Sequence, residues 1–99
     1  MKELLPPGKL WVYQCSVDLR KSYNSLSSLV TDELGLEVKS GDGFIFVNKQ
    51  KNLAKLLWWD RTGWCLLLKR LSGSKFRTKD NSELLELENF RVRTFFDGL

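Results

Sequence analysis

The sequence contains no histidine, and it has only two cysteines, two prolines and one methionine. Histidine is the most common general base and the most common metal ligand, so its absence excludes Ser-His-Asp and Cys-His catalysis within this chain. Cys15 and Cys65 lie far apart in the sequence, form no Cys-x-x-Cys motif, and cannot build a four-cysteine zinc site. We therefore expect free thiols, no metal, no cofactor, no small-molecule substrate and no enzymatic activity.

Long apolar runs are also absent. No stretch approaches the roughly 18 residues that cross a membrane, and the first residues lack the apolar core of a secretory signal. The composition is nevertheless that of a folded protein, with 99 residues of which 42% are hydrophobic and 28% are charged. These features predict one cytoplasmic domain over residues 1–99, with a loose lead-in over residues 1–9.

Positive charge is concentrated in the middle of the chain. Residues 43–79 hold nine basic side chains and one acidic one, a net charge of +8, whereas residues 1–42 carry −1 and residues 80–99 carry −3. A basic segment of this kind is typical of proteins that bind a polyanion. Lysines along strand edges also prevent aggregation, so charge alone leaves both interpretations open.

Hydrophobic periodicity predicts an α+β fold. Residues 17–34 repeat apolar side chains at helical spacing, with Asp18 as an N-cap, which predicts one long helix. Residues 89–96 predict a short helix, and apolar segments bounded by turns predict strands at 10–15, 44–47, 53–59, 64–71, 75–77 and 84–87. The predicted architecture is an antiparallel β-meander of four to five strands, with one long N-terminal helix on one face and a short C-terminal helix.

The central hairpin has a predictable register because Asp60 and Gly63 fit the first and last positions of a four-residue turn. Trp59 then lies opposite Trp64, and every second pair follows on the same face. Both faces are apolar near the turn and basic at the far end. The unbroken apolar run at residues 44–47 predicts a strand buried on both faces.

Two candidate surfaces follow from these placements. Basic residues that a folded meander would bring together could bind DNA phosphates; they are Arg20, Lys21, Lys49, Lys51, Lys55, Lys69, Arg70, Lys75 and Arg77. Tryptophans around the hairpin turn could anchor a protein partner, and with the neighbouring arginine they are Trp58, Trp59, Arg61 and Trp64. Asp18, Asp42 and Asp60 fall at cap or turn positions, so they predict local hydrogen bonds rather than a catalytic cluster.

Four segments carry a resemblance to a known family. They are Lys55-Leu-Leu-Trp-Trp-Asp-Arg-Thr-Gly-Trp-Cys-Leu-Leu-Leu-Lys-Arg-Leu71, Val17-Asp-Leu-Arg-Lys-Ser-Tyr-Asn-Ser-Leu26, Phe44-Ile-Phe-Val-Asn-Lys49 and Phe95-Phe-Asp-Gly-Leu99. In this order they resemble the accessory protein, of the TnpB or Orf2 type, of bacterial insertion sequences of the IS66 family. Asn24-Ser25 stands where that family has Asp-Gly, and Cys15 stands where it has glycine.

The resemblance implies a role in transposition beside a separate, larger transposase. Together with the basic residues listed above, it favours a non-enzymatic accessory factor that binds DNA, mainly through phosphates, and helps to assemble the transposase–DNA complex. The alternative is a protein adaptor that docks on the transposase, or on a second copy, through the tryptophan-rich hairpin without binding DNA.

Overall fold

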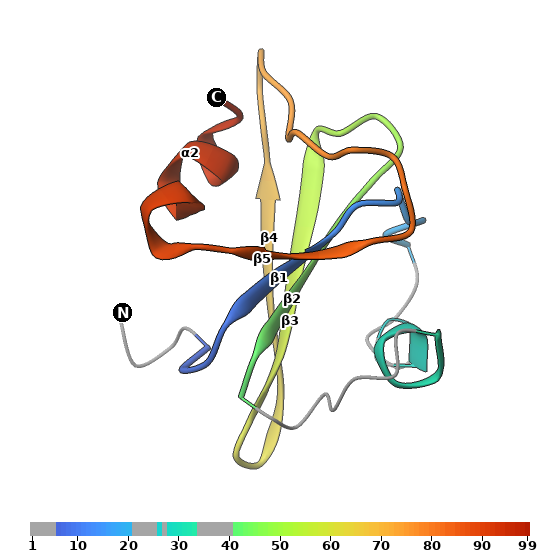
Figure 1. Cartoon of the computed structure of the whole chain (residues 1–99), viewed down its shortest axis with the longest axis vertical. Coiled ribbons are helices and arrows are strands. Elements are labelled where there is room, and N and C mark those ends of the chain that lie inside the picture. Colours follow the sequence, from blue (N-terminus) through green and yellow to red (C-terminus); the bar gives the residue numbers. More distant parts are fainter. Residues whose placement is uncertain (1–5, 21–25, 27, 34–40) are drawn as a thin grey trace.

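A computed structural model describes residues 6–20, 26, 28–33 and 41–99. These residues form one five-stranded sheet in the spatial order β4-β3-β2-β1-β5 (Figure 1). β1 and β2 run parallel, and the other neighbouring pairs are antiparallel. The strands are β1 (Leu10–Tyr13), β2 (Gly43–Val47), β3 (Leu53–Asp60), β4 (Gly63–Arg70) and β5 (Leu84–Leu87).

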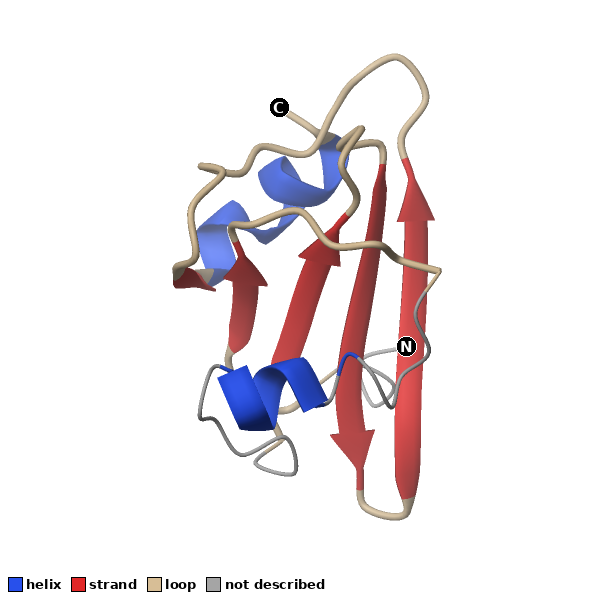
Figure 2. Ribbon diagram, turned by 90° about the vertical axis from the view of Figure 1, so that its right-hand side faces the viewer, coloured by secondary structure: helices blue, strands red, loops and turns tan. Residues whose placement is uncertain are grey.

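Short helical segments lie on the two sides of the sheet (Figure 2). A π-helical turn, η2 (Leu29–Glu33), comes between β1 and β2 in the chain. A 3-10 turn, η3 (Asn89–Arg91), leads into the C-terminal helix α2 (Val92–Asp97). α2 ends at Gly98, whose left-handed φ of 73° caps the helix. None of the helices that the structure describes has the length and apolar character needed to cross a membrane.

The sheet is covered by apolar side chains on both faces. One cluster packs η2 and its preceding segment against the sheet and contains Tyr13, Leu19, Leu26, Val30, Phe44, Phe46 and Leu57. The other face carries Val12, Ile45, Val47, Ala54, Leu56, Trp58 and Phe76, with Phe95 and Phe96 of α2 packed against them. Every residue of β2 is therefore buried, which confirms the strand predicted from its unbroken apolar run.

The predicted register of the central hairpin is confirmed. Trp59 pairs with Trp64, and at the other end of the ladder Leu53 pairs with Arg70. The two-residue turn between β3 and β4 leaves Arg61 at a φ of 47°, in the left-handed region. Because successive residues point to opposite faces, this register fixes which side chains of β3 and β4 enter each core.

Both cysteines are free thiols, as predicted from their number and spacing. Cys15 is exposed just after β1, and Cys65 is half-buried in β4.

The prediction of one long helix over residues 17–34 is wrong. Residues 17–20 are not helical, and the helical backbone that the structure describes in this stretch is at residues 26 and 28 and in the five-residue η2. The Asp18 carboxylate accepts the backbone N–H of Arg20 at 3.0 Å, and residues 21–25, where a helix that it could cap would begin, lie outside the described residues. The rest of the predicted helix, at residues 21–25, 27 and 34, lies outside the described residues.

The antiparallel meander is also wrong. β1 pairs in parallel with β2, and β5 returns to pair with β1 on the side away from β4. Residues 75–77, predicted as an edge strand, form no strand. Phe76 is buried between two exposed basic residues, and its N–H donates to the carbonyl oxygen of Lys51 at 2.7 Å in a loop–loop contact. The alternation that resembled a strand comes from one anchored side chain.

Candidate nucleic-acid interface

Three loops that meet at one end of the sheet carry many of the basic residues that the structure describes (Figure 1). They are residues 14–20 after β1, 48–52 after β2 and 71–80 after β4. Leu71 N–H donates to the Asn52 carbonyl oxygen at 2.8 Å, and Phe76 N–H donates to that of Lys51 at 2.7 Å. We define the basic end by the exposed cations at these loops: Arg20, Lys49, Arg70, Lys75, Arg77 and Lys79.

The loop at residues 48–52 is shaped by Asn48. Its side-chain oxygen accepts the backbone N–H groups of Asn52 and Leu53, both at 3.0 Å, and its amide donates to the Asn52 side chain at 2.7 Å. An asparagine that satisfies neighbouring backbone groups in this way stabilises a tight turn. Lys51 takes a φ of 60° there, and Lys49 stands exposed at the tip.

The loop at residues 71–80 is anchored by Phe76, which is 1% exposed and packs on Phe95 with ring centroids 5.4 Å apart. Gln14, itself buried, holds the end of the loop. Its side-chain oxygen accepts the Lys79 N–H at 2.7 Å, and its backbone oxygen accepts the Asp80 N–H at 3.1 Å. The buried Phe76 ring and the buried Gln14 side chain therefore fix the positions of the cations in this loop. No sequence pattern indicated Gln14, because its partner lies 65 residues away.

Three of the lysines predicted to bind DNA hold structural contacts at this end. The Lys51 ammonium group pairs with the Asp80 carboxylate at 2.7 Å. The Lys55 ammonium group donates to the Leu19 carbonyl oxygen at 3.0 Å. The Lys69 ammonium group pairs with the Asp97 carboxylate at 3.3 Å. Each contact joins two segments that are distant in the sequence. These lysines tie the loops and α2 to the sheet.

The remaining predicted cations are more accessible. Arg20 is exposed and pairs with Asp18 at 2.8 Å, and this hydrogen bond and charge raise the pKa of Arg20 above its ordinary value. Within the described part of the chain, no ion pair involves Lys49, Arg70, Lys75 or Arg77. Lys21 lies outside the described residues.

Hollows separate the cations of the basic end. One of about 520 Å³ has Arg20 and Lys49 in its walls, and another of about 540 Å³ has Lys75 and Arg77. A third hollow, also of about 540 Å³, brings Arg77 close to Arg91 of η3. Sequence analysis missed Arg91 because η3 meets this loop only through the folding of the chain. The arrangement offers separated positive charges rather than a closed pocket.

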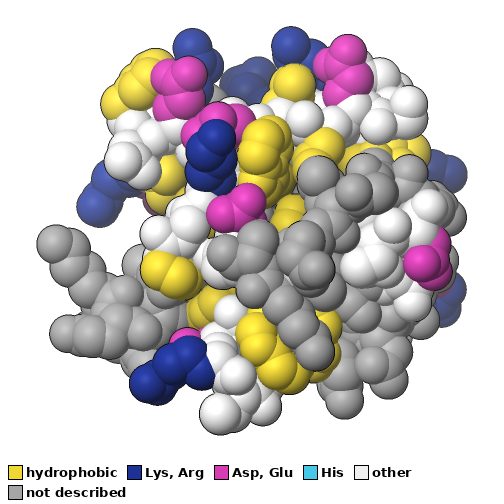
Figure 3. Space-filling model, turned by 60° about the horizontal axis from the view of Figure 1, so that its bottom comes forward, with side chains coloured by type: hydrophobic (Ala, Val, Ile, Leu, Met, Phe, Trp, Pro, Cys, Tyr) yellow, Lys and Arg dark blue, Asp and Glu magenta, His cyan; other side chains and the backbone are white. Residues whose placement is uncertain are grey.

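The opposite end of the sheet holds the tryptophan-rich hairpin turn. Trp58 is 5% exposed and lies in the core on the α2 side. Trp59 and Trp64 are half-buried, and their rings pack edge to face with centroids 5.1 Å apart. Arg61 is exposed at the tip. Figure 3, with this end turned forward, shows Lys and Arg scattered and mostly toward the rim.

The three carboxylates considered in the sequence do not converge. Asp42 accepts the Lys9 N–H at 2.9 Å and the Trp11 indole N–H at 3.0 Å, Asp18 bonds within its own turn, and Asp60 closes the β3–β4 hairpin. Asp18 therefore makes the local hydrogen bond that its position predicted, whereas both partners of Asp42 lie more than 30 residues away and join the lead-in to the sheet. Among the described residues, no group of three His, Cys, Asp or Glu side chains could hold a metal ion.

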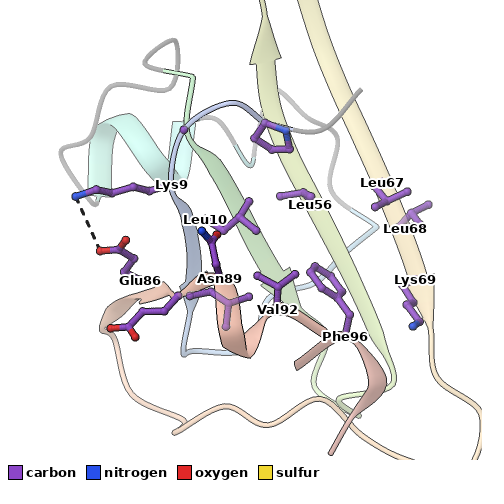
Figure 4. Close-up of a pocket in the computed structure, with 14 residues that line it drawn as sticks. Lys9, Leu10, Leu56, Leu67, Leu68, Lys69, Glu86, Asn89, Val92 and Phe96 are labelled. Carbon is purple, nitrogen blue, oxygen red and sulfur yellow. Dashed lines mark ion pairs between the residues drawn. The ribbon is translucent and has the colours of Figure 1, made fainter. Parts of the chain in front are cut away.

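A large apolar groove lies on the α2 face of the sheet. Its volume is about 1040 Å³, and its floor and walls include Leu10, Leu56, Val92 and Phe96 (Figure 4). At one end Lys9 pairs with Glu86 at 3.9 Å. The other end opens along β4, where Leu67, Leu68 and Lys69 line it (Figure 4).

Comparison with known proteins identifies the family. Residues 8–99 match the family described as IS66 Orf2 like protein. The chain belongs to this family. The resemblance expected from the motifs of residues 17–26, 44–49, 55–71 and 95–99 is therefore confirmed, and membership suggests an accessory role in transposition rather than a known class of enzyme.

A curated relative is also similar. The chain is 33% identical over 76 residues to a protein of Sinorhizobium fredii (strain NBRC 101917 / NGR234) described as "Uncharacterized protein y4hO". The aligned region covers 74% of this chain and 66% of that protein, just under two thirds of its length. No solved structure matches the chain.

Proposed function

We propose that this IS66 Orf2-like protein binds the phosphate backbone of DNA through its basic end. It would act in the bacterial cytoplasm as a non-enzymatic accessory factor that helps to assemble the transposase–DNA complex. The observation that carries the proposal is the gathering of six exposed cations at one end of the sheet, five from three separate loops and Arg70 from the end of β4. A role in transposition, which the family suggests, makes DNA the expected polyanion.

The shape of the basic end favours backbone contacts over the reading of base sequence. The described residues present loops at this end, and no recognition helix stands there to enter a major groove. Separated lysines and arginines are suited to phosphates spaced along a duplex. The molecule measures 36 × 29 × 21 Å, so the end of its long axis spans less than one DNA turn of about 34 Å. Over so short a stretch of DNA, the number of phosphate contacts is limited by the number of exposed cations at the basic end.

The proposal is tested by removing two exposed charges from the basic end. Lys75→Ala with Arg77→Ala removes cations for which no ion pair is described, so the fold should persist. Each lost phosphate contact should weaken binding to a duplex by roughly tenfold at 0.1 M salt. We expect a loss on the order of 50-fold, measured by fluorescence anisotropy, with circular dichroism as the check on folding.

The matched control removes two charges elsewhere. Lys9→Ala with Arg61→Ala makes the same change in net charge at residues remote from the basic end, and it should change the dissociation constant by less than about threefold. Equal losses in the two double variants would mean that binding depends on net charge alone. The proposed basic surface would then be wrong.

The adaptor function through the tryptophan-rich hairpin is the second candidate. Arg61 and the half-buried Trp59 and Trp64 are the groups that favour it, since they form an accessible turn. Trp58 is buried in the core on the α2 side, so its ring does not contact a partner. This candidate predicts co-purification with the transposase and no affinity for DNA, and loss of co-purification in Arg61→Ala with Trp59→Ala.

A further inference from the structure

The outer edge of β4 is apolar and lies at the margin of the described sheet (Figure 2). Leu66, Leu67 and Leu68 are 43%, 45% and 57% exposed, although they occupy the middle of an eight-residue strand. Backbone N–H and C=O groups alternate sides along a strand, so every second β4 residue directs its pair away from β3. A long apolar edge of this kind is a template for pairing with another strand.

The opposite edge of the sheet is built differently. β5 has only four residues, and Glu83, Glu86 and Glu88 stand in or beside it. The chain then turns directly into η3 and α2, which lie next to this edge. Short length and like charges are the usual devices that prevent edge pairing. β4 has neither device over its three leucines, because its charges, Lys69 and Arg70, lie only at its end.

We propose that β4 pairs with β4 of a second copy of this chain, antiparallel and centred on Leu67. The reason for choosing a second copy is that the strand is complementary to itself in this register. Leu67 lies opposite its own equivalent, Leu66 lies opposite Leu68, and Arg70 lies opposite the aromatic ring of Trp64. A two-fold interface requires exactly such a self-complementary patch.

Charge and side-chain pairing disfavour the other simple arrangements of two β4 strands. A parallel arrangement in register would place Lys69 and Arg70 of the two copies against each other, where like charges are destabilising. The antiparallel arrangement sends the two basic pairs to opposite ends of the joint. Shifting it by two residues in either direction would break the Leu66–Leu68 pairs. Leu67 and Leu68 also line the open end of the apolar groove, so the second copy would cover that end.

The expected dimer is weak and reversible. Eight residues at about 3.4 Å each make an edge roughly 27 Å long, and a sheet is about 10 Å thick with its side chains. The two copies would therefore bury on the order of 540 Å² together, below the roughly 1,000 Å² of a stable interface. The pairing does not depend on the proposed DNA binding. If both hold, the dimer would carry its two basic ends on opposite ends of a continuous sheet, where each could contact a separate DNA segment.

Sedimentation of the intact chain, without DNA, tests the pairing. Between about 5 and 500 μM, we expect the mass to rise from that of one chain toward that of two, as a weak interface requires. Leu67→Lys would place two ammonium groups directly opposite each other and should hold the protein at one chain. Leu99→Lys, at a leucine that is 71% exposed near the C-terminus, should associate like the unmodified chain.

A cross-linking pair tests the register. In a Cys15→Ser, Cys65→Ser background, Leu67→Cys would meet its own equivalent across the two-fold axis and should form a disulfide-linked dimer on mild oxidation. Leu68→Cys would be about 7–8 Å from its equivalent on the diagonal and should cross-link much less. A single-chain mass at every concentration, or equal cross-linking at the two positions, would overturn the proposal. DNA binding by such a monomer would leave the proposed function intact.

Discussion

Phe76 should be the side chain on which the basic end most depends, although it lies between two cations in a loop. Its ring is 1% exposed and contacts two aromatic rings of α2, with centroids 5.4 Å from Phe95 and 6.5 Å from Phe96. Replacing a buried phenylalanine by alanine ordinarily costs about 3–5 kcal/mol, from lost burial and from the cavity left behind. A chain of this length ordinarily has about 5–15 kcal/mol of total stability. Phe76→Ala should therefore lose a large share of the free energy of unfolding.

The assay is urea unfolding followed by tryptophan fluorescence, with Phe90→Ala as the matched control. Phe90 is 72% exposed, and the Arg91 guanidinium carbon lies 5.2 Å from the centroid of its ring. Removing this ring should therefore lower the free energy of unfolding by about 0.5–1 kcal/mol. With a slope of about 2 kcal/mol per molar urea, Phe76→Ala should lower the midpoint by roughly 2 M. If the two variants unfold within about 1 kcal/mol of each other, the loop is not anchored by Phe76, and the account of how the cations are positioned is refuted.

Two backbone positions give predictions of opposite sign in the same assay. Arg61 occupies a left-handed φ of 47° at the hairpin turn, so Arg61→Gly should relieve strain and raise stability by about 0.5–1 kcal/mol; a loss of stability would show that the arginine side chain matters more than the backbone. Gly98 has a φ of 73°, and an added Cβ would lie 2.8 Å from Leu71 Cδ1 and 2.9 Å from the Lys75 carbonyl oxygen. Gly98→Ala should therefore lower stability by about 1–3 kcal/mol, and unchanged unfolding would contradict this crowding.

The parts of the fold that the sequence predicted correctly are those with a local cause. The turn residues Asp60 and Gly63 fix where β3 ends and β4 begins, and side-chain alternation then sets the whole register. The apolar run of β2 needs no partner information, because four consecutive apolar residues fit a strand covered on both faces.

The parts that failed depend on distant contacts. The apolar spacing of Leu19, Leu26 and Val30 is helical, and all three residues do enter one core, yet Leu19 reaches it from a turn and only Leu26 and Val30 from helical backbone. Strand order also has no local signal. Nothing near residues 84–87 indicates that they pair with β1, which lies more than 70 residues earlier in the chain.

The candidate site shows the same division. The sequence indicated that basic residues would collect at one end of the hairpin, and the register brings Lys55, Lys69 and Arg70 there. It could not separate the lysines that form structural contacts from the exposed ones. That distinction depends on partners such as Asp80 and Asp97, which come from other parts of the chain.

The central claim is that the basic end binds DNA phosphates, and the salt dependence of binding tests it most directly. Affinity of the unmodified chain is measured by fluorescence anisotropy across a salt series, with a duplex from an end of the insertion sequence and a scrambled duplex of equal length. Each phosphate contact contributes about −0.9 to the slope of log affinity against log salt. If between half and all of the exposed cations at the basic end contact phosphates, the slope lies between about −2.7 and −5.4, nearly equal for the two duplexes. A slope near zero, or no binding at low salt, would contradict the account.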